Sequence, residues 1–165
     1  MCSFRFYECL FTEKSIEFLQ NAFKSSNIHL NVEIAHYIIQ QVDNVPYYIQ
    51  FLAHQIWEYA MINSISRVDQ SIVDSSLQDI LELKKDYYWE LTNNQSIHRK
   101  KLLFALSQDA KELYSEKTSK KYELGAASST QKSLEVLLNE GIIEKNQNYY
   151  EFADPMYKTF VKNNL

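Results

Sequence analysis

The strongest structural signal lies in Ala126–Pro155, AASSTQKSLEVLLNEGIIEKNQNYYEFADP. Its first part predicts a helix, because Ser128 and Gln131 form the S-x-x-Q pattern of a capping box. One apolar face is predicted by three leucines at helical spacing, Leu134, Leu137 and Leu138. Gly141 follows at the position where a left-handed residue ends many helices, and glycine adopts that conformation without strain.

A hairpin is predicted directly after this helix. Ile142–Lys145 and Tyr149–Phe152 are rich in branched and aromatic residues, and they flank the turn-forming run Asn146-Gln147-Asn148. Asp154 precedes Pro155 and predicts the capped start of a last helix. A helix followed by a small hairpin is the second half of a winged helix-turn-helix.

These residues resemble a known family. Ser128-Ser129-Thr130, Leu137, Gly141-Ile142-Ile143, Tyr150 and Asp154-Pro155 are similar to the C-terminal winged helix of the archaeal-type ATPases, which are P-loop proteins of the AAA+ and signal-transduction kind. The resemblance implies that the chain is a C-terminal lid and winged-helix region whose ATPase core, its partner in cis, is missing here. The winged helix would then transmit or sense the nucleotide-dependent movement of the lid through a protein or DNA partner.

The resemblance extends to the first half of the chain through one motif. In those ATPases a Gly-x-Pro sequence followed by aromatic residues opens a lid helix near the bound adenine, and the matching positions here are Asn44, Val45, Pro46 and Tyr47. Asparagine replaces the glycine and keeps some tolerance for left-handed backbone. The resemblance therefore implies nucleotide contact at these four residues only with an ATPase core, with ATP or ADP as ligand of the parent and no cofactor in this chain.

Composition favours long helices in an ordinary globular protein. The 165 residues are 45% hydrophobic and 23% charged, with two Gly and two Pro. No apolar run approaches the roughly 20 residues needed to cross a bilayer, and no signal peptide is recognisable. Cys2 and Cys9 are expected to be free thiols. These features predict a cytoplasmic protein with no membrane partner.

The order of helices predicts two domains after a short leading segment. Ser3–Phe11 alternates loosely and resembles a strand without a partner, so residues 1–11 are interpreted as the remnant of a segment leaving an ATPase core. A helical, lid-like domain is predicted for residues 12–94, and a winged helix-turn-helix for residues 95–165. The helix starts expected in the first domain are Thr12, Asn31, Pro46 and Asp69.

The second domain is expected to contain three helices before the hairpin. Gln95–Ser107 predicts the first, Ser115–Lys121 predicts a short second one, and the third is the helix preceding Gly141. The fold class is therefore mostly α, a small helical bundle followed by a winged helix-turn-helix with a two-stranded wing.

Catalytic signatures are absent from the sequence. It contains no G-x-x-x-x-G-K-[ST], no G-x-G-x-x-G and no H-E-x-x-H, so the chain is not expected to be an enzyme. His54 and Glu58 are one helical turn apart and form the single weak pair of potential metal ligands, which is more often a surface contact. No metal is predicted.

The exposed face of the helix before Gly141 is the candidate interaction surface. It is predicted to carry Ser129, Lys132, Ser133, Val136 and Glu140, with help from Lys117, Lys120 and Lys121 on the preceding helix and Lys145 in the wing. The sequence holds 6 Lys and Arg against 12 Asp and Glu up to Asn94, and 11 against 9 from Gln95 onward. A dedicated DNA-binding domain is usually more basic, so a protein contact is favoured over DNA.

Two functions from different classes remain open. The favoured one is a non-catalytic regulatory or interaction region that couples the nucleotide state of an ATP-binding protein to a protein or DNA partner. The alternative is a free-standing winged-helix transcription regulator whose helical first half dimerises.

Overall fold

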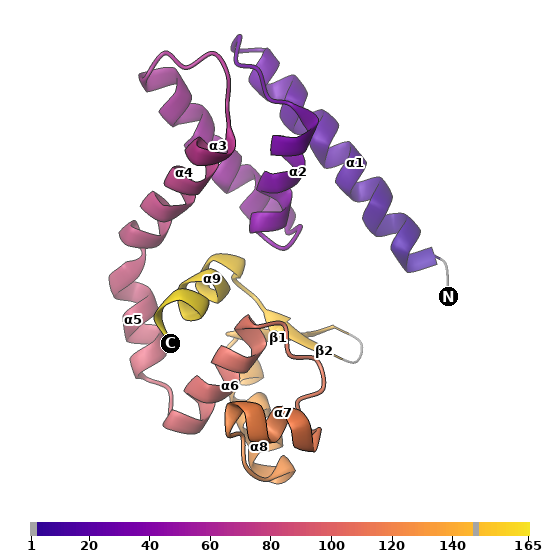
Figure 1. Cartoon of the computed structure of the whole chain (residues 1–165), viewed down its shortest axis with the longest axis vertical. Helices are drawn as coiled ribbons and strands as arrows, with labels where there is room; N and C mark the ends of the chain where they lie inside the picture. The colour runs from indigo at the N-terminus through magenta and orange to yellow at the C-terminus, as the bar shows by residue number, and fades with distance from the viewer. Residues whose placement is uncertain (1–2, 147–148) are drawn as a thin grey trace. The chain divides into compact units, whose positions relative to one another are not determined.

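The computed structural model describes residues 3–146 and 149–165, which form helices and one two-stranded antiparallel sheet (Figure 1). They divide into two compact units, a first unit up to Glu82 and a second unit from Leu83. The second unit thus begins at Leu83, whereas the winged helix-turn-helix was predicted for residues 95–165. The short helix α5 (Lys85–Asn93) belongs to the second unit because its buried side chains, Tyr88 and Thr92, bond to residues near the C-terminus.

The first unit is a small bundle of helices. It contains α1 (Ser3–Lys24), α2 (Val32–Gln41), α3 (Pro46–Ile62) and most of α4 (Gln70–Leu83), and α2 packs on both α1 and α3. Its core is largely aliphatic, with fully buried side chains that include Leu19, Ile38, Leu52 and Ile56. Burial of this apolar surface is the main contribution to the stability of such a bundle.

The helix starts in this unit follow the predicted chemistry. Asn31 caps α2 by accepting a hydrogen bond from the Ile34 N–H at 2.8 Å. Asp69 accepts one from the Ile72 N–H at 3.1 Å, just before α4 begins. Pro46 occupies the first position of α3, where its missing N–H is not needed. These three predictions are confirmed.

The start of the first helix was predicted wrongly. Ser3–Phe11, interpreted as a strand, lies in α1, and Thr12 is inside that helix instead of capping it. No glycine or proline interrupts Ser3–Lys24, and a helix satisfies its own backbone hydrogen bonds where a lone strand leaves them open. Thr12 instead accepts a hydrogen bond from the Asn44 side-chain amide at 3.4 Å.

The second unit is built around α6 (Ile97–Ser107). This helix packs against α7 (Glu116–Tyr122), α8 (Ala127–Asn139), β2 (Tyr149–Phe152) and α9 (Pro155–Asn164). Strand β1 (Ile143–Asn146) follows α8 and pairs with β2, with Ile143 opposite Phe152 and Asn146 opposite Tyr149. The predicted helices and hairpin are thus confirmed. Of the predicted turn residues, Asn146 ends β1, and Gln147 and Asn148 lie outside the described residues.

The two ends of α8 match the prediction unequally. Gly141 has φ of +66°, the left-handed conformation expected where the helix stops. The capping box at Ser128 is wrong, because α8 begins one residue earlier, at Ala127, and its cap residue Ala126 offers no side-chain acceptor. Gln131, the other member of that predicted box, bonds instead to Tyr114 and Glu135.

A buried polar network holds α5 against α9. The Tyr88 hydroxyl donates to Asp154 Oδ2 at 2.9 Å, and Asp154 Oδ1 accepts the backbone N–H groups of Met156 and Tyr157 at 2.8 and 3.2 Å. Thr92 donates to the Tyr88 carbonyl at 2.7 Å, so its oxygen accepts from the Tyr157 hydroxyl at 2.9 Å. Burial raises the pKa of Tyr157, which keeps this hydroxyl a donor at neutral pH.

Candidate interaction site

The candidate site is formed by α7, the turn that follows it, α8 and the hairpin. Ser115 caps α7 by accepting a hydrogen bond from the Thr118 N–H at 3.2 Å. The turn between α7 and α8 uses two left-handed residues, Glu123 and Gly125, on either side of the fully buried Leu124. Leu124 anchors the turn in the core and so fixes the direction in which α8 leaves it.

His98 joins three elements of this site. On α6, its Nε2 lies 2.6 Å from the carbonyl oxygen of Leu124 and its Nδ1 lies 2.8 Å from the Ser133 hydroxyl on α8. A carbonyl oxygen only accepts, so Nε2 carries a proton, and in the neutral ring Nδ1 accepts from Ser133. Sequence reasoning missed this role because the histidines show no spacing pattern. The single available signal was a histidine in the first turn of a predicted helix.

The outward face of α8 is polar and nearly neutral. Its exposed polar side chains are Ser128, Ser129, Gln131, Lys132, Glu135 and Asn139. Of the predicted contact residues, Ser129 and Lys132 are exposed, whereas Ser133 and Val136 are half-buried on the flank. Glu140 accepts a hydrogen bond from the Gln95 amide at 2.8 Å. The predicted set is therefore split, and the helix presents one lysine beside one glutamate.

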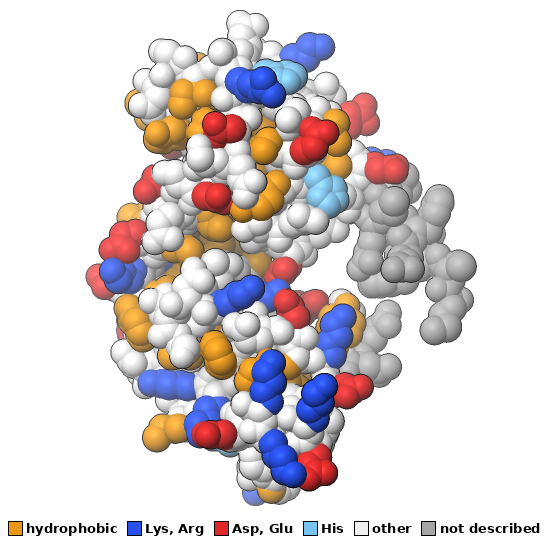
Figure 2. All heavy atoms as spheres, viewed as in Figure 1, with side chains coloured by type: hydrophobic (Ala, Val, Ile, Leu, Met, Phe, Trp, Pro, Cys, Tyr) orange, Lys and Arg blue, Asp and Glu red, His pale blue; other side chains and the backbone are white. Residues whose placement is uncertain are grey.

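The lysines expected to assist are mostly engaged by their own neighbours. Lys120 forms an ion pair with Glu116 at 2.6 Å. Lys121 donates to the Tyr122 hydroxyl at 2.8 Å and lies over its ring, and Lys145 lies 5.9 Å from the ring centre of Tyr150. In Figure 2 the Lys and Arg side chains on the second unit are interspersed with Asp and Glu side chains.

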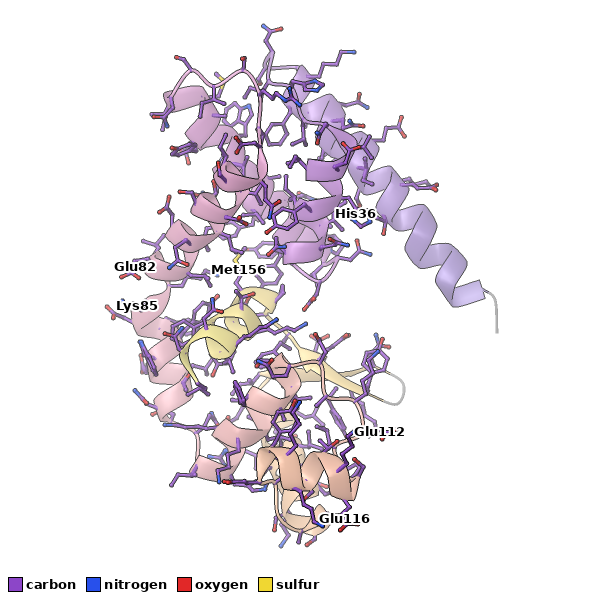
Figure 3. All side chains as sticks on the ribbon, in the orientation of Figure 1. His36, Glu82, Lys85, Glu112, Glu116 and Met156 are labelled. Atoms are coloured by element: carbon purple, nitrogen blue, oxygen red, sulfur yellow. The ribbon has the colours of Figure 1, made fainter. Side chains whose placement is uncertain are left out.

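The wing adds negative charge. Glu144 and Glu151 are directly opposite each other on neighbouring strands and are both exposed. Like charges in this arrangement repel, and they also repel phosphate groups. Glu112 and Glu116 project outward from the loop before α7 and from its first turn (Figure 3).

Tyr114 ties the wing to α8. Its hydroxyl donates to the Gln131 side chain, and Gln131 in turn donates to Glu135 at 2.9 Å. Burial, together with a hydrogen bond to Tyr150 in β2, raises the pKa of Tyr114 to about 12. Residues from the loop, the wing and α8 thus form one hydrogen-bonded surface, which sequence reasoning did not predict.

The four residues proposed for nucleotide contact span the end of the turn before α3 and the first two residues of α3 in the first unit. Asn44 is left-handed with φ of 60°, as the substitution for glycine allows, and Asp43 before it is also left-handed. Val45 is extended, Pro46 opens α3, and Tyr47 is 68% exposed with its ring stacked on Phe51. The oxygen Oδ1 of Asn44 is buried and has no hydrogen-bond partner among the described residues.

Two further features bear on function. Within the described part of the chain, no group of three or more His, Cys, Asp or Glu side chains could hold a metal ion, and His54 stacks on Trp57. None of the described helices has the length and apolar character needed to span a membrane.

Comparison with known proteins identifies the second unit. Residues 85–163 match a family model described as a probable winged helix domain. The helices and two-stranded hairpin of the second unit have the fold of a winged helix. The match begins at the first residue of α5, so this helix is part of the domain, in agreement with its packing on α9. No curated protein and no solved structure matches the chain.

Proposed function

We propose that the chain is a non-catalytic interaction region of an ATP-binding protein and that its winged helix domain binds a protein partner. The observation that supports binding to a protein is the charge pattern of α8 and the wing. α8 presents Lys132 beside Glu135, and the wing presents Glu144 opposite Glu151. Binding to a duplex depends mainly on several cations that reach phosphates, and this surface lacks such a row.

The link to an ATP-binding parent rests on the resemblance at Asn44, Val45, Pro46 and Tyr47 and in the winged helix. Because the chain contains no P-loop motif, any nucleotide bound there needs an ATPase core supplied by the parent. In that arrangement, the bound nucleotide changes the populations of the lid positions. The winged helix then responds to the changed position of the lid.

A free-standing DNA-binding regulator is the second candidate. It is favoured by Lys117 and Lys132, which are exposed and form no ion pair with any described residue. These two side chains and the N-terminal end of α8, whose first turn contains no acidic residue, are the groups that would approach phosphates.

Titration with a fluorescent duplex at low and at moderate salt separates the two candidates. A protein-binding domain is expected to show weak DNA binding that disappears at moderate salt and is equal in Lys132→Gln and in the control Lys162→Gln at the end of α9. Binding that persists at moderate salt and is lost in Lys132→Gln would instead support the regulator.

The proposed ATP-binding parent is tested by reading the DNA sequence upstream of the segment that encodes this chain. An open reading frame that continues upstream in frame and encodes a G-x-x-x-x-G-K-[ST] motif supports the ATP-binding parent. A stop codon in frame directly before a ribosome-binding site overturns it. The DNA titration tests the partner of the winged helix, and the upstream sequence tests the ATP-binding parent. Either proposal can be overturned while the other stands.

A further inference from the structure

A polar hollow lies at the C-terminal end of α1 in the first unit. Its volume is about 520 Å³, and it is lined by Gln20, Asn21, Lys24, Asn27, Ile28, His29 and Leu30. This volume is within the range of small-molecule sites, about 300–1,000 Å³. None of these seven lining residues is acidic. Three of them, Gln20, Asn21 and Asn27, have side-chain amides that can donate hydrogen bonds.

The lining is unusual because the rest of the first unit is acidic. Residues 12–82 contain nine Asp or Glu but three Lys or Arg, which are Lys14, Lys24 and Arg67. Lys24 lines the hollow together with His29, and Arg67 is the backbone partner of His29. Basic side chains and a histidine gather at this end of the unit in Figure 2. Two of the three basic residues of residues 12–82 thus lie in or beside a hollow whose lining contains no acidic residue.

The frame of the hollow is well anchored. His29 and Arg67 form a parallel bridge, in which the His29 N–H donates to the Ser66 carbonyl at 2.8 Å and the Val68 N–H donates to the His29 carbonyl at 3.1 Å. The buried side chains of Ile28, Leu30 and Val68 hold both segments on the core. Gln20 donates to the Leu30 carbonyl at 3.0 Å, which fixes α1 against the same segment.

From this combination we propose that the hollow binds the phosphate group of a small polar phosphomonoester. Lys24 supplies a charge-assisted hydrogen bond to the phosphate oxygens, and the imidazole N–H of His29 donates a second hydrogen bond. Asn21 and Asn27 also line the hollow, whose volume is larger than a phosphate and suits a hydroxyl-bearing group. Arg67, which also lies near Asp69, contributes its charge at longer range.

The test is a two-dimensional NMR titration of the full chain with inorganic phosphate, glucose 6-phosphate and, as the uncharged control, glucose. Saturable shifts are expected for the amides of residues 20–30 and 66–68 with both phosphates but not with glucose. Lys24→Gln is expected to weaken binding about tenfold or more because it removes a charge-assisted hydrogen bond, and His29→Ala is expected to weaken it because it removes a hydrogen-bond donor. Lys14→Gln, which removes a lysine from the same helix outside the hollow, is the matched control and leaves binding unchanged.

Three outcomes would overturn the proposal. One is an absence of saturation, and another is an equal effect of Lys14→Gln, which would indicate diffuse screening of charge. The third concerns the position of Lys24 in the last turn of α1, where a cation offsets the negative end of the helix dipole. If Lys24→Gln lowered stability but left phosphate binding unchanged, the lysine would serve the helix alone.

Discussion

The two units differ in whether a buried hydroxyl group is hydrogen-bonded. In the second unit, Thr92 is completely buried and its hydroxyl bonds to both the Tyr88 carbonyl and the Tyr157 hydroxyl. In the first unit, the hydroxyl of Ser76 is buried in α4 and has no hydrogen-bond partner among the described residues. A satisfied buried network specifies one packing arrangement, whereas an unpaired buried group costs stability.

This contrast shows where each unit obtains its specificity. The first unit relies on aliphatic packing between helices, so a polar group in its core contributes little. The winged helix domain uses Tyr88, Thr92, Asp154 and Tyr157 to join α5 to α9, which are far apart in the sequence. Each unit contains one tryptophan, Trp57 in the first and Trp89 in the second, so the fluorescence of each can report on its own unit.

The largest effect is expected for Asp154→Ala. This substitution removes the cap of α9 and leaves the buried Tyr88 hydroxyl without its acceptor. We expect the second unit to lose about 2–4 kcal/mol of its free energy of unfolding. The measurement is urea unfolding followed by Trp89 fluorescence in a Trp57→Phe background. Asp154→Asn keeps an oxygen that can cap α9 and should lose clearly less, and equal losses in the two variants would contradict the capping role.

Thr92→Val tests the satisfied network directly. Valine keeps the shape of threonine but leaves the Tyr157 hydroxyl without its acceptor, while the Tyr88 carbonyl keeps the backbone hydrogen bond of α5. We expect a loss of about 1–3 kcal/mol in the Trp89 signal. Thr92→Ser retains the hydroxyl and is the control for the missing methyl group. A valine variant as stable as the wild type would show that the network adds nothing to apolar packing.

Ser76→Ala is expected to have the opposite sign. Removing an unpaired buried hydroxyl should stabilise the first unit by about 1 kcal/mol. Urea unfolding followed by Trp57 fluorescence in a Trp89→Phe background measures the change. The neighbouring Ser75 is exposed on the same helix, so Ser75→Ala controls for helix propensity and should change stability by less than about 0.5 kcal/mol. A loss of stability in Ser76→Ala would mean that this hydroxyl has a partner in solution.

Local chemistry allowed much of the fold to be predicted. Asn31, Pro46, Asp154 and Gly141 each act within a few residues of their own position, and the helix or turn signal of each is confirmed. The wrong predictions have a common cause. Thr12 and Ser128 are residue types that favour helix starts, but in each case the helix begins at an earlier residue than predicted. α1 begins at Ser3 and α8 begins at Ala127.

The candidate site was harder to predict because it depends on contacts between distant residues. Lys132 and Ser129 were placed correctly on the exposed face of α8 from periodicity alone. The bonds from His98 to Leu124 and Ser133 span 26 and 35 positions, and no sequence spacing reveals them. The position of α5 was missed for the same reason, since the bond from Tyr88 to Asp154 spans 66 positions.

The smallest effect at neutral pH concerns Tyr114, a partly exposed polar contact that differs from the buried network around Thr92. Burial and the hydrogen bond to Tyr150 raise its pKa from 10.0 to about 12, so the folded state holds the phenolic proton more tightly than the unfolded state. The resulting stabilisation is fully present below about pH 10 and is lost as the pH rises toward 12.

Ultraviolet difference titration should compare the wild type with Tyr114→Phe. The tyrosinate signal that the wild type shows and the variant lacks should appear near pH 12. In Tyr150→Phe the hydrogen bond is lost, and the titration of Tyr114 should move back toward 10.0 while remaining above it, since burial is the larger cause. Titration of Tyr114 at its ordinary pKa in the wild type would mean that the wing is not tied to α8 through this residue. In that case the two parts of the proposed contact surface would be free to act separately.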